Sequence, residues 1–514
     1  MAIRVCFWIA RTFIMKISTK NFFSALYLVV LLGTLAACAV GPDYQAREAL
    51  QLKQITEKKV PLELKSESEI VGGATQVFVE GKDTPAQWWH LFGSKDLNQL
   101  VDTSLKNNPT LGVAEATLRS AIETANVQFG SLFPAISAGT SVTPQSVPPS
   151  VYGGTTGTNN IYTLYNANIN VTYRLDLFGR TRRAIESAKA LADYQQFQLE
   201  TTYLSLTSNI VTTAIKEAAQ REQLLATADI LRAQQEFSKV ITGQFEIGTV
   251  SRIDVSSQNT LVANTQSQLL TYEKNLAITR NMLVAYTGGF PGETTPPKFS
   301  LSSLTLPTEI PAVLPSKLVR QRPDIRAAEA QLMAANAQVG VATANLFPQI
   351  NLTGVLGTQA LASQALFGPG AGLWSLGAGL VQPIMQGGTL TAQRRVVEAQ
   401  YEQAVLNYQA VVVGAFQEVS NALHALDIAA QTLKSAATAE KNAALGLDLV
   451  RQQYQLGTVN YLALLNAQTQ YQQARINLIQ SQAERFSNTA ALYAALGGGW
   501  WNRDGPAYQS TLHK

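Results

Sequence analysis

Apolar and polar residues alternate in one segment of the chain, which predicts a strand, and long stretches without proline elsewhere predict helices. From residue 161 to 177 the apolar side chains recur every second residue, which is typical of a strand with one apolar and one solvated face. The apolar set is Ile161, Tyr165, Ala167, Ile169, Val171, Tyr173, Leu175 and Leu177, and the polar set is Asn166, Asn168, Asn170, Thr172, Arg174 and Asp176. A loop rich in Pro, Gly, Ser and Thr precedes this strand, so a β-hairpin is predicted over about 135–177.

Long helices are predicted from the absence of proline between turn-forming glycines. Two stretches without proline follow Gly179 and Gly388, reverse at Gly248 and Gly457, and return to Gly288 and Gly497. Each is predicted to be a helical hairpin. A shorter helix precedes each β-hairpin, from Pro109 to Pro134 and from Pro323 to Pro348, since proline suits a first helical turn and also marks a break. At about 1.5 Å per residue, this short helix and the returning helix together match the length of the long one. We therefore expect them to lie end to end.

One unit occurs twice in the chain. Residues 108–136 match residues 322–350, with Leu132-Phe133-Pro134 against Leu346-Phe347-Pro348. Gly248-Thr249-Val250 matches Gly457-Thr458-Val459. A second, more glycine-rich β-hairpin is expected at about 349–386.

This repeat gives the predicted organisation of the chain. The segments are a signal peptide (1–37, of which 1–14 are a possible start-codon extension), a lipidated N-terminus with linker and equatorial segment (38–107), the first repeat (108–289, tip near 248), a proline-rich connector (290–321), the second repeat (322–499, tip near 457) and a C-terminal tail (500–514). Residues 45–85 are polar and expected to be extended.

Four strands per chain cannot close a barrel, because about eight is the practical minimum. A sheet that faces lipid cannot leave its edges open, and symmetric rings are the usual solution. The expected fold is an α+β membrane protein. Three copies would form a 12-stranded β-barrel continuous with a helical barrel.

The N-terminus has the features of a secretory signal. A basic start at Lys16 and Lys20 is followed by an apolar run over 22–35. The run ends Leu35-Ala36-Ala37-Cys38, which resembles a bacterial lipoprotein signal. That resemblance implies cleavage before Cys38 and a covalent lipid (diacylglycerol and N-acyl) on it. A plain signal peptide with an incidental cysteine is the alternative, and the true start is Met1 or Met15.

Composition and charge exclude several classes. Only 14% of the residues are charged against 46% hydrophobic, which argues against both a solvated coiled-coil rod and disorder. The net charge of +4 comes entirely from residues 1–37, which carry four of the 39 basic side chains and no acidic one. The remaining chain is neutral, with 35 basic and 35 acidic side chains, so no electrostatic case for nucleic acid remains.

No enzyme chemistry is expected. His90, His424 and His513 lack metal-ligand spacing, and there is no Gly-x-Ser-x-Gly or phosphate loop. Trp88-Trp89 and Trp500-Trp501 are interpreted as packing residues rather than a ligand cage. The basic run from Arg322 to Arg326 is interpreted as helix capping and ion pairing with Glu329.

Several motifs resemble the TolC-like outer-membrane factors, specifically the lipoprotein branch that includes OprM and NodT. They are Cys38-Ala-Val-Gly-Pro-Asp-Tyr44, Trp88-Trp-His-Leu-Phe92, Leu314-Pro-Ser-Lys-Leu-Val-Arg-Gln-Arg-Pro-Asp-Ile-Arg-Ala-Ala-Glu329, Tyr454-Gln-Leu-Gly-Thr-Val-Asn-Tyr-Leu-Ala-Leu-Leu-Asn-Ala-Gln468 and Ala495-Leu-Gly-Gly-Gly-Trp500. The resemblance covers nearly all of the mature chain. It implies a homotrimeric exit duct whose periplasmic tip docks on a membrane-fusion adaptor, which links it to an inner-membrane transporter, expected to be of the RND type.

The resemblance also assigns site residues. The adaptor-docking tip is expected at Gly248, Thr249, Val250, Gly457, Thr458 and Val459. The periplasmic aperture is expected at Asp254, Tyr454 and Asn466, with an ordinary solvated residue as the alternative for Asp254. Val459 stands where some members have arginine, and Ala463 and Asn466 where some have aspartate. An aperture with one acidic ring should attract cations less and be latched less tightly.

The function predicted from these features is a passive outer-membrane channel that exports small molecules or drugs in a tripartite efflux pump. It would be lipid-anchored in the outer membrane of a Gram-negative bacterium, with a large periplasmic portion and no cofactor besides its lipid. A duct for secreted polypeptides is the first alternative, and a structural outer-membrane lipoprotein the second. The sequence names neither the cargo nor the adaptor and pump.

Overall fold

The computed structural model describes residues 39–45, 56, 61–152, 157–312 and 315–503, and the chain divides into two compact units. The first unit comprises Met1–Ala46, Ser120–Asp193 and Ala330–Leu406, and the second comprises Arg47–Arg119, Tyr194–Glu329 and Asn407–Lys514. The predicted signal segment, Cys38 and the end of the tail lie outside the described residues.

Helices and strands follow the predicted order along the chain. The elements are β1 (Glu63–Leu64), β2 (Gln76–Val79), η2 (Trp88–Phe92), α3 (Lys95–Asn107), α4 (Pro109–Gly130), β3 (Ala135–Val147), η3 (Pro149–Tyr152), β4 (Asn160–Leu175), α5 (Arg180–Glu246), α6 (Arg252–Tyr286), η4 (Leu301–Ser303), β5 (Glu309–Pro311), α7 (Pro315–Gln321), α8 (Pro323–Ala344), β6 (Gln349–Ala360), η5 (Ser363–Ala365), β7 (Gly372–Val381), α9 (Thr389–Gln455), α10 (Tyr461–Ala495) and η6 (Trp500–Asn502).

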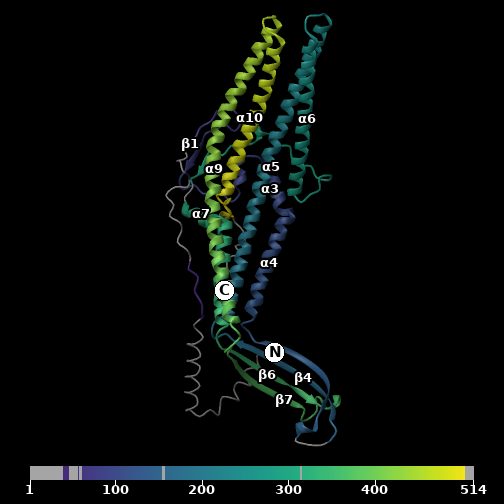
Figure 1. Cartoon of the computed structure of the whole chain (residues 1–514), viewed down its shortest axis with the longest axis vertical. Coiled ribbons are helices and arrows are strands. Elements are labelled where there is room, and N and C mark those ends of the chain that lie inside the picture. Colours follow the sequence, from purple (N-terminus) through teal and green to yellow (C-terminus); the bar gives the residue numbers. More distant parts are fainter. Residues whose placement is uncertain (1–38, 46–55, 57–60, 153–156, 313–314, 504–514) are drawn as a thin grey trace. The chain divides into compact units, whose positions relative to one another are not determined.

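The first unit contains an antiparallel sheet in the order β3-β4-β6-β7 (Figure 1). Its central pair joins the two repeats, because β4 pairs with β6 in unbroken register from Tyr165 opposite Ala360 to Leu175 opposite Ile350. Within the chain, β3 pairs only with β4 and β7 only with β6 among the described strands. Both edges of this sheet are therefore open to another strand.

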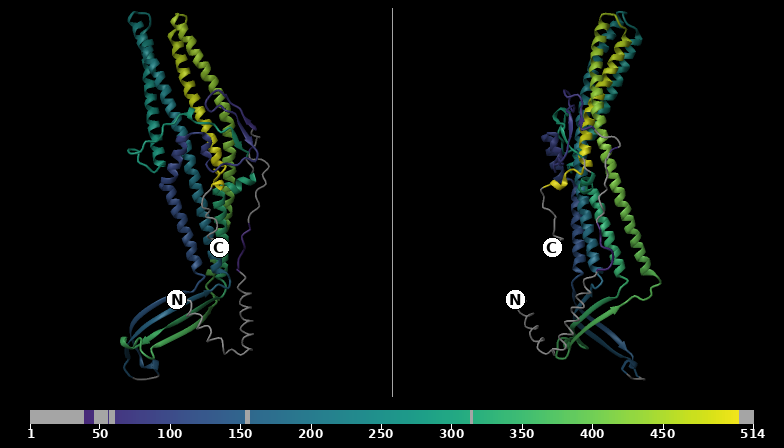
Figure 2. Two further views of the ribbon diagram at one scale, coloured as in Figure 1. Left: turned by 180° about the vertical axis from the view of Figure 1, so that it is seen from behind. Right: turned by 90° about the vertical axis from the view of Figure 1, so that its left-hand side faces the viewer.

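The duplication is visible in the helices. α5 and α9 each have 67 residues, α6 and α10 each have 35, and α4 and α8 each have 22. Figure 2 shows the α5–α6 hairpin and the α9–α10 hairpin running in the same direction. Their tips lie where the sequence places the Gly-Thr-Val motifs, between Glu246 and Arg252 and between Gln455 and Tyr461.

The short helices meet the returning helices end to end, as the helix lengths predict. Asn108, just before α4, donates its side-chain amide to the carbonyl of Tyr286 at the end of α6, over 2.9 Å. In the second repeat, the Arg322 guanidinium donates to the carbonyl of Ala495 at the end of α10, also over 2.9 Å. Each joint satisfies a carbonyl that the end of a helix would leave unpaired.

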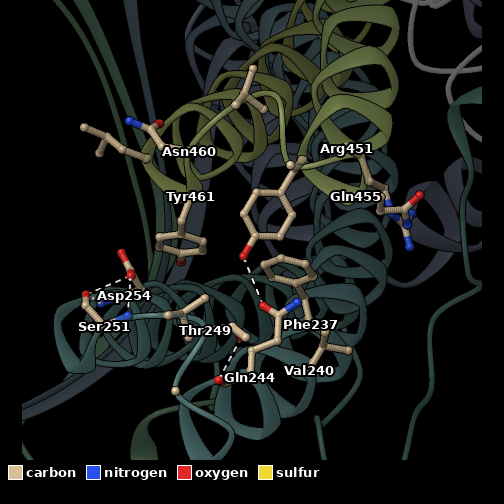
Figure 3. A pocket seen from close by; sticks show the side chains of 16 residues that line it. Phe237, Val240, Gln244, Thr249, Ser251, Asp254, Arg451, Gln455, Asn460 and Tyr461 are labelled. Atoms are coloured by element: carbon tan, nitrogen blue, oxygen red, sulfur yellow. Dashed lines mark hydrogen bonds between the residues drawn. The ribbon is translucent and has the colours of Figure 1, made fainter.

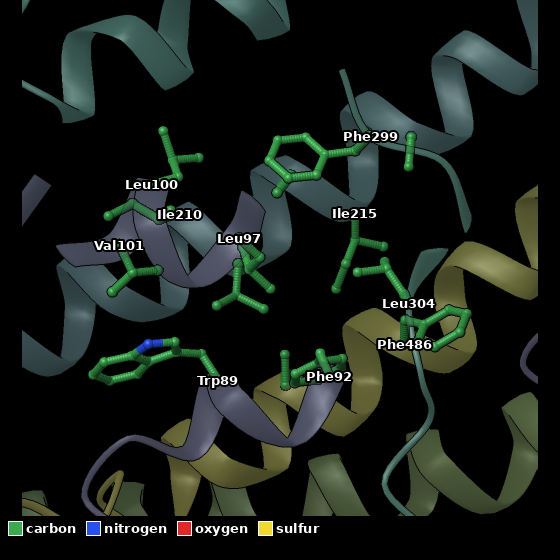
Figure 4. Packing of buried hydrophobic residues seen from close by; sticks show 14 of the residues in the cluster. Trp89, Phe92, Leu97, Leu100, Val101, Ile210, Ile215, Phe299, Leu304 and Phe486 are labelled. Carbon is green, nitrogen blue, oxygen red and sulfur yellow. The ribbon is translucent and has the colours of Figure 1, made fainter. Parts of the chain in front are cut away.

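The core of the second unit includes Trp88 and Trp89, two of the four tryptophans that the sequence marks as packing residues, and Figure 4 shows Trp89 within this cluster. Trp88 and Trp89 are 1% and 0% exposed and lie among side chains of α3, α5, α10 and the connector. Trp88 stacks on Tyr493 with ring centroids 5.9 Å apart. Their interpretation as packing residues is thereby confirmed. So is the predicted Arg326–Glu329 ion pair, at 3.0 Å.

The second unit also contains a small sheet that the sequence did not predict. β1, β2 and β5 form a three-stranded sheet in which β2 pairs with β5 in parallel. The described chain thus has seven strands rather than four, and part of the segment 45–85 is sheet rather than free extended chain. The connector likewise contains β5 and the helix α7. Strands of two to four residues are too short to show a period, and β5 lies more than 200 residues from its partner.

Among the described residues, no helix combines the length and apolar character needed to cross a bilayer. No group of three or more His, Cys, Asp or Glu side chains there is placed to hold a metal ion. His90 lies in η2 and His424 is an exposed residue of α9.

Candidate functional site

Both hairpin tips are built by the same glycine turn. Gly248 donates its N–H to the carbonyl of Phe245 over 2.9 Å, and Thr249 donates its N–H to the carbonyl of Gln244 over 2.9 Å. These two bonds form a Schellman motif, which ends a helix with a left-handed residue. Gly457 and Thr458 repeat it at the end of α9, and both threonine hydroxyls bond to the same carbonyls as their own N–H groups.

The tip glycines are required by their backbone and leave space beside them. Gly248 has φ +80° and Gly457 has φ +73°, a region where a side chain costs roughly 1–2 kcal/mol. A Cβ added at either position would meet nothing within 4 Å. A substitution there would therefore add a side chain to an open surface without displacing a neighbour.

The helices that leave the tips begin with different caps. Ser251 and Asp254 form a capping box: the Ser251 hydroxyl accepts from the N–H of Asp254, and Asp254 accepts from the N–H and hydroxyl of Ser251 at 2.9 and 2.7 Å. In the second repeat Asn460 caps α10 by accepting from the N–H of Ala463 over 3.0 Å. Ala463 occupies the position that corresponds to Asp254 and has no carboxylate. The capping box is therefore present only in the first repeat.

The two tips line one groove of about 920 Å³, called the tip groove below (Figure 3). Its lining residues are Phe237, Val240, Gln244, Gly248, Thr249, Val250, Ser251, Asp254, Arg451, Tyr454, Gln455, Gly457, Val459, Asn460, Tyr461 and Leu462. Asp254 and Arg451 are the only charged side chains in this set. The groove is thus a largely neutral surface shared by both repeats.

Neutral hydrogen bonds tie the two hairpins together at the groove. The Tyr454 hydroxyl on α9 donates to Gln244 Oε1 on α5 over 3.1 Å (Figure 3). The Tyr461 hydroxyl on α10 donates to Gln258 Oε1 on α6 over 2.7 Å. Gln258 Nε2 in turn donates to the carbonyl of Gln234 over 2.8 Å. Each bond joins groups from different helices.

An aromatic cluster fills the space between these bonds. Phe237 lies parallel to Tyr461, with an interplanar angle of 7° and ring centroids 6.3 Å apart. Tyr454 meets Phe237 edge-on, with centroids 5.8 Å apart, and also approaches Tyr461 edge-on. The cluster covers Tyr461, which is 6% exposed.

Electrostatics keep both tyrosines neutral. Burial, and after it the charge of Asp254, raises the pKa of Tyr461 to about 12. The pKa of Tyr454 is raised for the same two reasons. Both phenols therefore remain hydrogen-bond donors at any physiological pH.

The structure brings most of the predicted site residues together. Five of the six predicted tip residues line the tip groove, whereas Thr458 does not. Of the predicted aperture residues, Tyr454 and Asp254 line it, and Asn466 is an exposed residue of α10 outside it. Asp254 is neither free nor bonded to Tyr454, since its carboxylate caps α6. The lipid site, Cys38, lies outside the described residues.

Sequence reasoning missed the residues that join the two hairpins at and beside the groove. Gln244, Gln258, Phe237 and Tyr461 carry the contacts between the hairpins, and none of them was singled out. Tyr461 stands within the motif that follows Tyr454, but nothing in a helical period distinguishes it from other buried residues. Gln258 could have been found only from its position in the packed hairpins.

Comparisons with known proteins identify the family to which the chain belongs. The sequence matches the family described as "Outer membrane efflux protein" over residues 100–289 and 314–498. It is 31% identical over 490 residues to the antibiotic efflux pump outer membrane protein ArpC of Pseudomonas putida, covering 95% of this chain and 98% of ArpC. Identity and coverage are the same for the toluene efflux pump outer membrane protein TtgC, also of Pseudomonas putida. The solved structure of the outer-membrane channel OprN matches with a TM-score of 0.81 at 27% identity, covering 90% of this chain and 100% of that one.

Proposed function

Since the chain belongs to the outer membrane efflux protein family, we propose that it is the passive outer-membrane duct of a tripartite efflux pump for small molecules. The observation that supports this proposal is the tip groove. It is lined by the tips of both helical hairpins, and each tip is an exposed glycine turn with the same pattern of hydrogen bonds. Such a surface suits docking of a periplasmic adaptor. The names of two relatives refer to antibiotics and toluene, which favours small molecules over polypeptides as cargo.

The working assembly is a homotrimer. The sheet of one chain has two open edges, β3 and β7, and a sheet that faces lipid cannot leave its backbone groups unpaired. Three copies would join these edges into a closed sheet of twelve strands. A ring of identical chains needs one repeated interface, here an edge of β3 against an edge of β7.

The lipid anchor is proposed at Cys38, as diacylglycerol and N-acyl groups, with no other cofactor. The segment directly after it is fixed to the first unit. The N–H of Val40 donates to the carbonyl of Phe178 over 3.1 Å, and the buried Arg183 forms an ion pair with Asp43 at 2.6 Å. Asn336 donates to the carbonyl of Pro42 over 2.9 Å. A lipid on Cys38 would therefore start next to a fixed point of the fold.

Opening is proposed as a shift between two states of the tip, with no covalent chemistry. The bonds Tyr454–Gln244 and Tyr461–Gln258 hold the two hairpins of a chain together. An adaptor that binds more tightly to the open tip would shift the equilibrium toward it, and the energy for transport would come from an inner-membrane transporter of the RND type.

The docking role is tested with a photoreactive residue at Val459 in cells that express their pumps, followed by mass spectrometry of the captured protein. Capture of a periplasmic adaptor is expected. The matched control carries the same probe at Ile161, an exposed position of the sheet, and should capture no adaptor. Capture of only further copies of this chain from Val459 would contradict docking at the tip.

A substitution at the second tip gives an independent test. Gly457→Arg places a long cation on the open turn and should abolish efflux while trimers still assemble. Gly446→Arg is the matched control, because Gly446 lies within α9 and also has open space beside it. Full efflux with Gly457→Arg would show that this turn is not part of the adaptor-binding interface.

A further inference from the structure

The four-stranded sheet has one apolar face and one mainly polar face, called the amide face below, which also carries Leu164, Val355 and Leu373. On the polar face Asn166 donates to the Ser141 hydroxyl over 3.3 Å, and Gln359 donates to Asn166 over 2.8 Å. Asn170 donates to Asn168 on the same strand over 3.0 Å. The unbroken register of β4 with β3 and β6 keeps these side chains on one face. In a closed sheet surrounded by lipid, this face lines the interior.

A single charge stands on that polar face. Between Ala135 and Leu175, and between Gln349 and Val381, the sequence contains no Asp, Glu, Lys or Arg other than Arg174. Arg174 is exposed and shares its face of β4 with Asn166, Asn168, Asn170 and Thr172, opposite Asn351 of β6. It takes part in no ion pair with any described residue of the chain.

The neighbouring carboxylate in the sequence, Asp176, bonds to other groups. Asp176 accepts from the N–H groups of Thr181 and Arg182 at 3.0 and 2.9 Å, and forms an ion pair with the Arg182 guanidinium at 3.3 Å. It thus caps α5 rather than neutralising Arg174. The next cation along the chain, Arg180, donates to Asn345 over 2.7 Å. Burial, and after it the charge of Arg174, lowers the pKa of Arg180, which places the two cations within each other's field.

We propose that Arg174 is the residue that sets the charge preference of the membrane section of the duct, favouring negatively charged small organic molecules. The proposal rests on the proposed function, since it requires the sheet to close around a water-filled passage. In a trimer the three copies of Arg174 form one cationic ring in an otherwise uncharged wall. Anionic cargo is concentrated at this ring and cationic cargo is depleted.

The dimensions allow such a ring to act across the whole passage. Twelve strands spaced about 4.8 Å apart and tilted by about 40° enclose a backbone cylinder roughly 24 Å across. The axis therefore lies about 12 Å from the wall, and the arginine side chains reach part of that way inward. The Debye length is about 8 Å at physiological salt, so three charges on this wall act on ions near the axis. Their effect should weaken as salt is raised.

The experiment measures the reversal potential of purified full-length trimers in planar bilayers, across a tenfold KCl gradient at low salt. Arg174→Gln should lower the chloride-to-potassium permeability ratio by about threefold or more, because fixed charge in a narrow passage sets the local ion concentrations. Arg174→Glu should lower it further, and Arg174→Lys should leave it near the wild-type value. The difference between wild type and Arg174→Gln should shrink at about 1 M salt.

Moving the charge to a neighbouring position distinguishes an electrostatic role of Arg174 from a structural one. Thr172 lies on the same face as Arg174, so the double variant Arg174→Gln, Thr172→Arg should recover the chloride preference. A merely structural role of Arg174 would not be rescued in this way. Ion current with an unchanged permeability ratio in Arg174→Gln would overturn this inference and leave the duct intact. Complete absence of ion current also in folded trimers whose tip bonds are removed by Tyr454→Phe and Tyr461→Phe would instead overturn the proposed function.

Discussion

Tyr461 joins the two hairpins of the chain through a hydrogen bond between side chains that are almost fully buried. It is 6% exposed, and its partner Gln258 is 0% exposed. Tyr461→Phe keeps the stacked ring but leaves Gln258 Oε1 without a donor, which costs about 1–3 kcal/mol. If the tie exists only in the closed tip, the open fraction should rise about fivefold or more. The measurement is the open probability of single channels in planar bilayers.

Tyr454→Phe is the matched control for that change. Its hydroxyl donates to Gln244 over the longer distance of 3.1 Å, and Tyr454 is less buried than Tyr461. Loss of this bond leaves an acceptor that water can reach, so the open probability should rise less than in Tyr461→Phe. An equal open probability in wild type and Tyr461→Phe would show that the Tyr461–Gln258 bond persists in the open state.

Among individual residues, the sequence predicts those whose identity is required by the backbone conformation. Gly248 and Gly457 are predictable, because a tight helical reversal requires a residue with positive φ. The carboxylate of Asp254 was predicted only as an aperture group or a solvated residue, and its capping bonds to Ser251 provide a local role that both alternatives omit. Gln258 was not predictable, since its partner lies about 200 residues away on another helix.

Among the elements, a fully buried carboxylate joins the connector between the repeats to two helices. Glu217 on α5 is 0% exposed; it forms ion pairs with Arg221 and with Arg280 of α6 and accepts the N–H of Phe299 over 3.1 Å. Arg280 also donates to the carbonyls of Pro296 and Pro297. These contacts, called the Glu217 clamp below, join two helices to the start of the connector.

Removing the charge of this clamp should destabilise the second unit. Glu217→Gln leaves two arginines without their carboxylate and should cost about 3–5 kcal/mol, because one partner of a buried pair is lost. The measurements are the thermal midpoint by circular dichroism and the rate of proteolysis within the connector. Glu222→Gln is the control, since it accepts a single N–H, from Leu301, and an amide oxygen can still accept it. Equal thermal midpoints for wild type and Glu217→Gln would contradict the clamp.

The long elements were predictable and the short ones were not. Proline-free stretches and the duplicated motifs predict α5, α6, α9 and α10, because helices of 35 and 67 residues require long segments without a helix-breaking residue. The sheet of β1, β2 and β5 forms through pairing with a segment more than 200 residues away. Its strands of two to four residues have too few positions to show alternation.

For the whole molecule, the decisive question is which face of the four-stranded sheet contacts lipid. The apolar face carries side chains such as Trp374 and Leu376, which are 77% and 82% exposed in the single chain. Such exposure is costly in water and favourable in a bilayer. The amide face, by contrast, would leave its polar groups without partners in lipid. Membership of the outer membrane efflux protein family agrees with an apolar face turned to the membrane.

Two adjacent residues of β7 allow a test of which face of the sheet contacts lipid. Leu376 lies on the apolar face opposite Gly354, and Ser375 lies on the amide face opposite Val355. Leu376→Arg places a cation in lipid at about 2–4 kcal/mol per copy, and with three copies per trimer the assembled form should fall at least about tenfold. Ser375→Arg adds the same side chain to the water-filled side and should assemble normally. Native mass spectrometry of the detergent-extracted outer membrane measures both yield and stoichiometry. If Ser375→Arg blocked assembly and Leu376→Arg did not, the faces would be reversed and the ring of Arg174 would lie outside the duct.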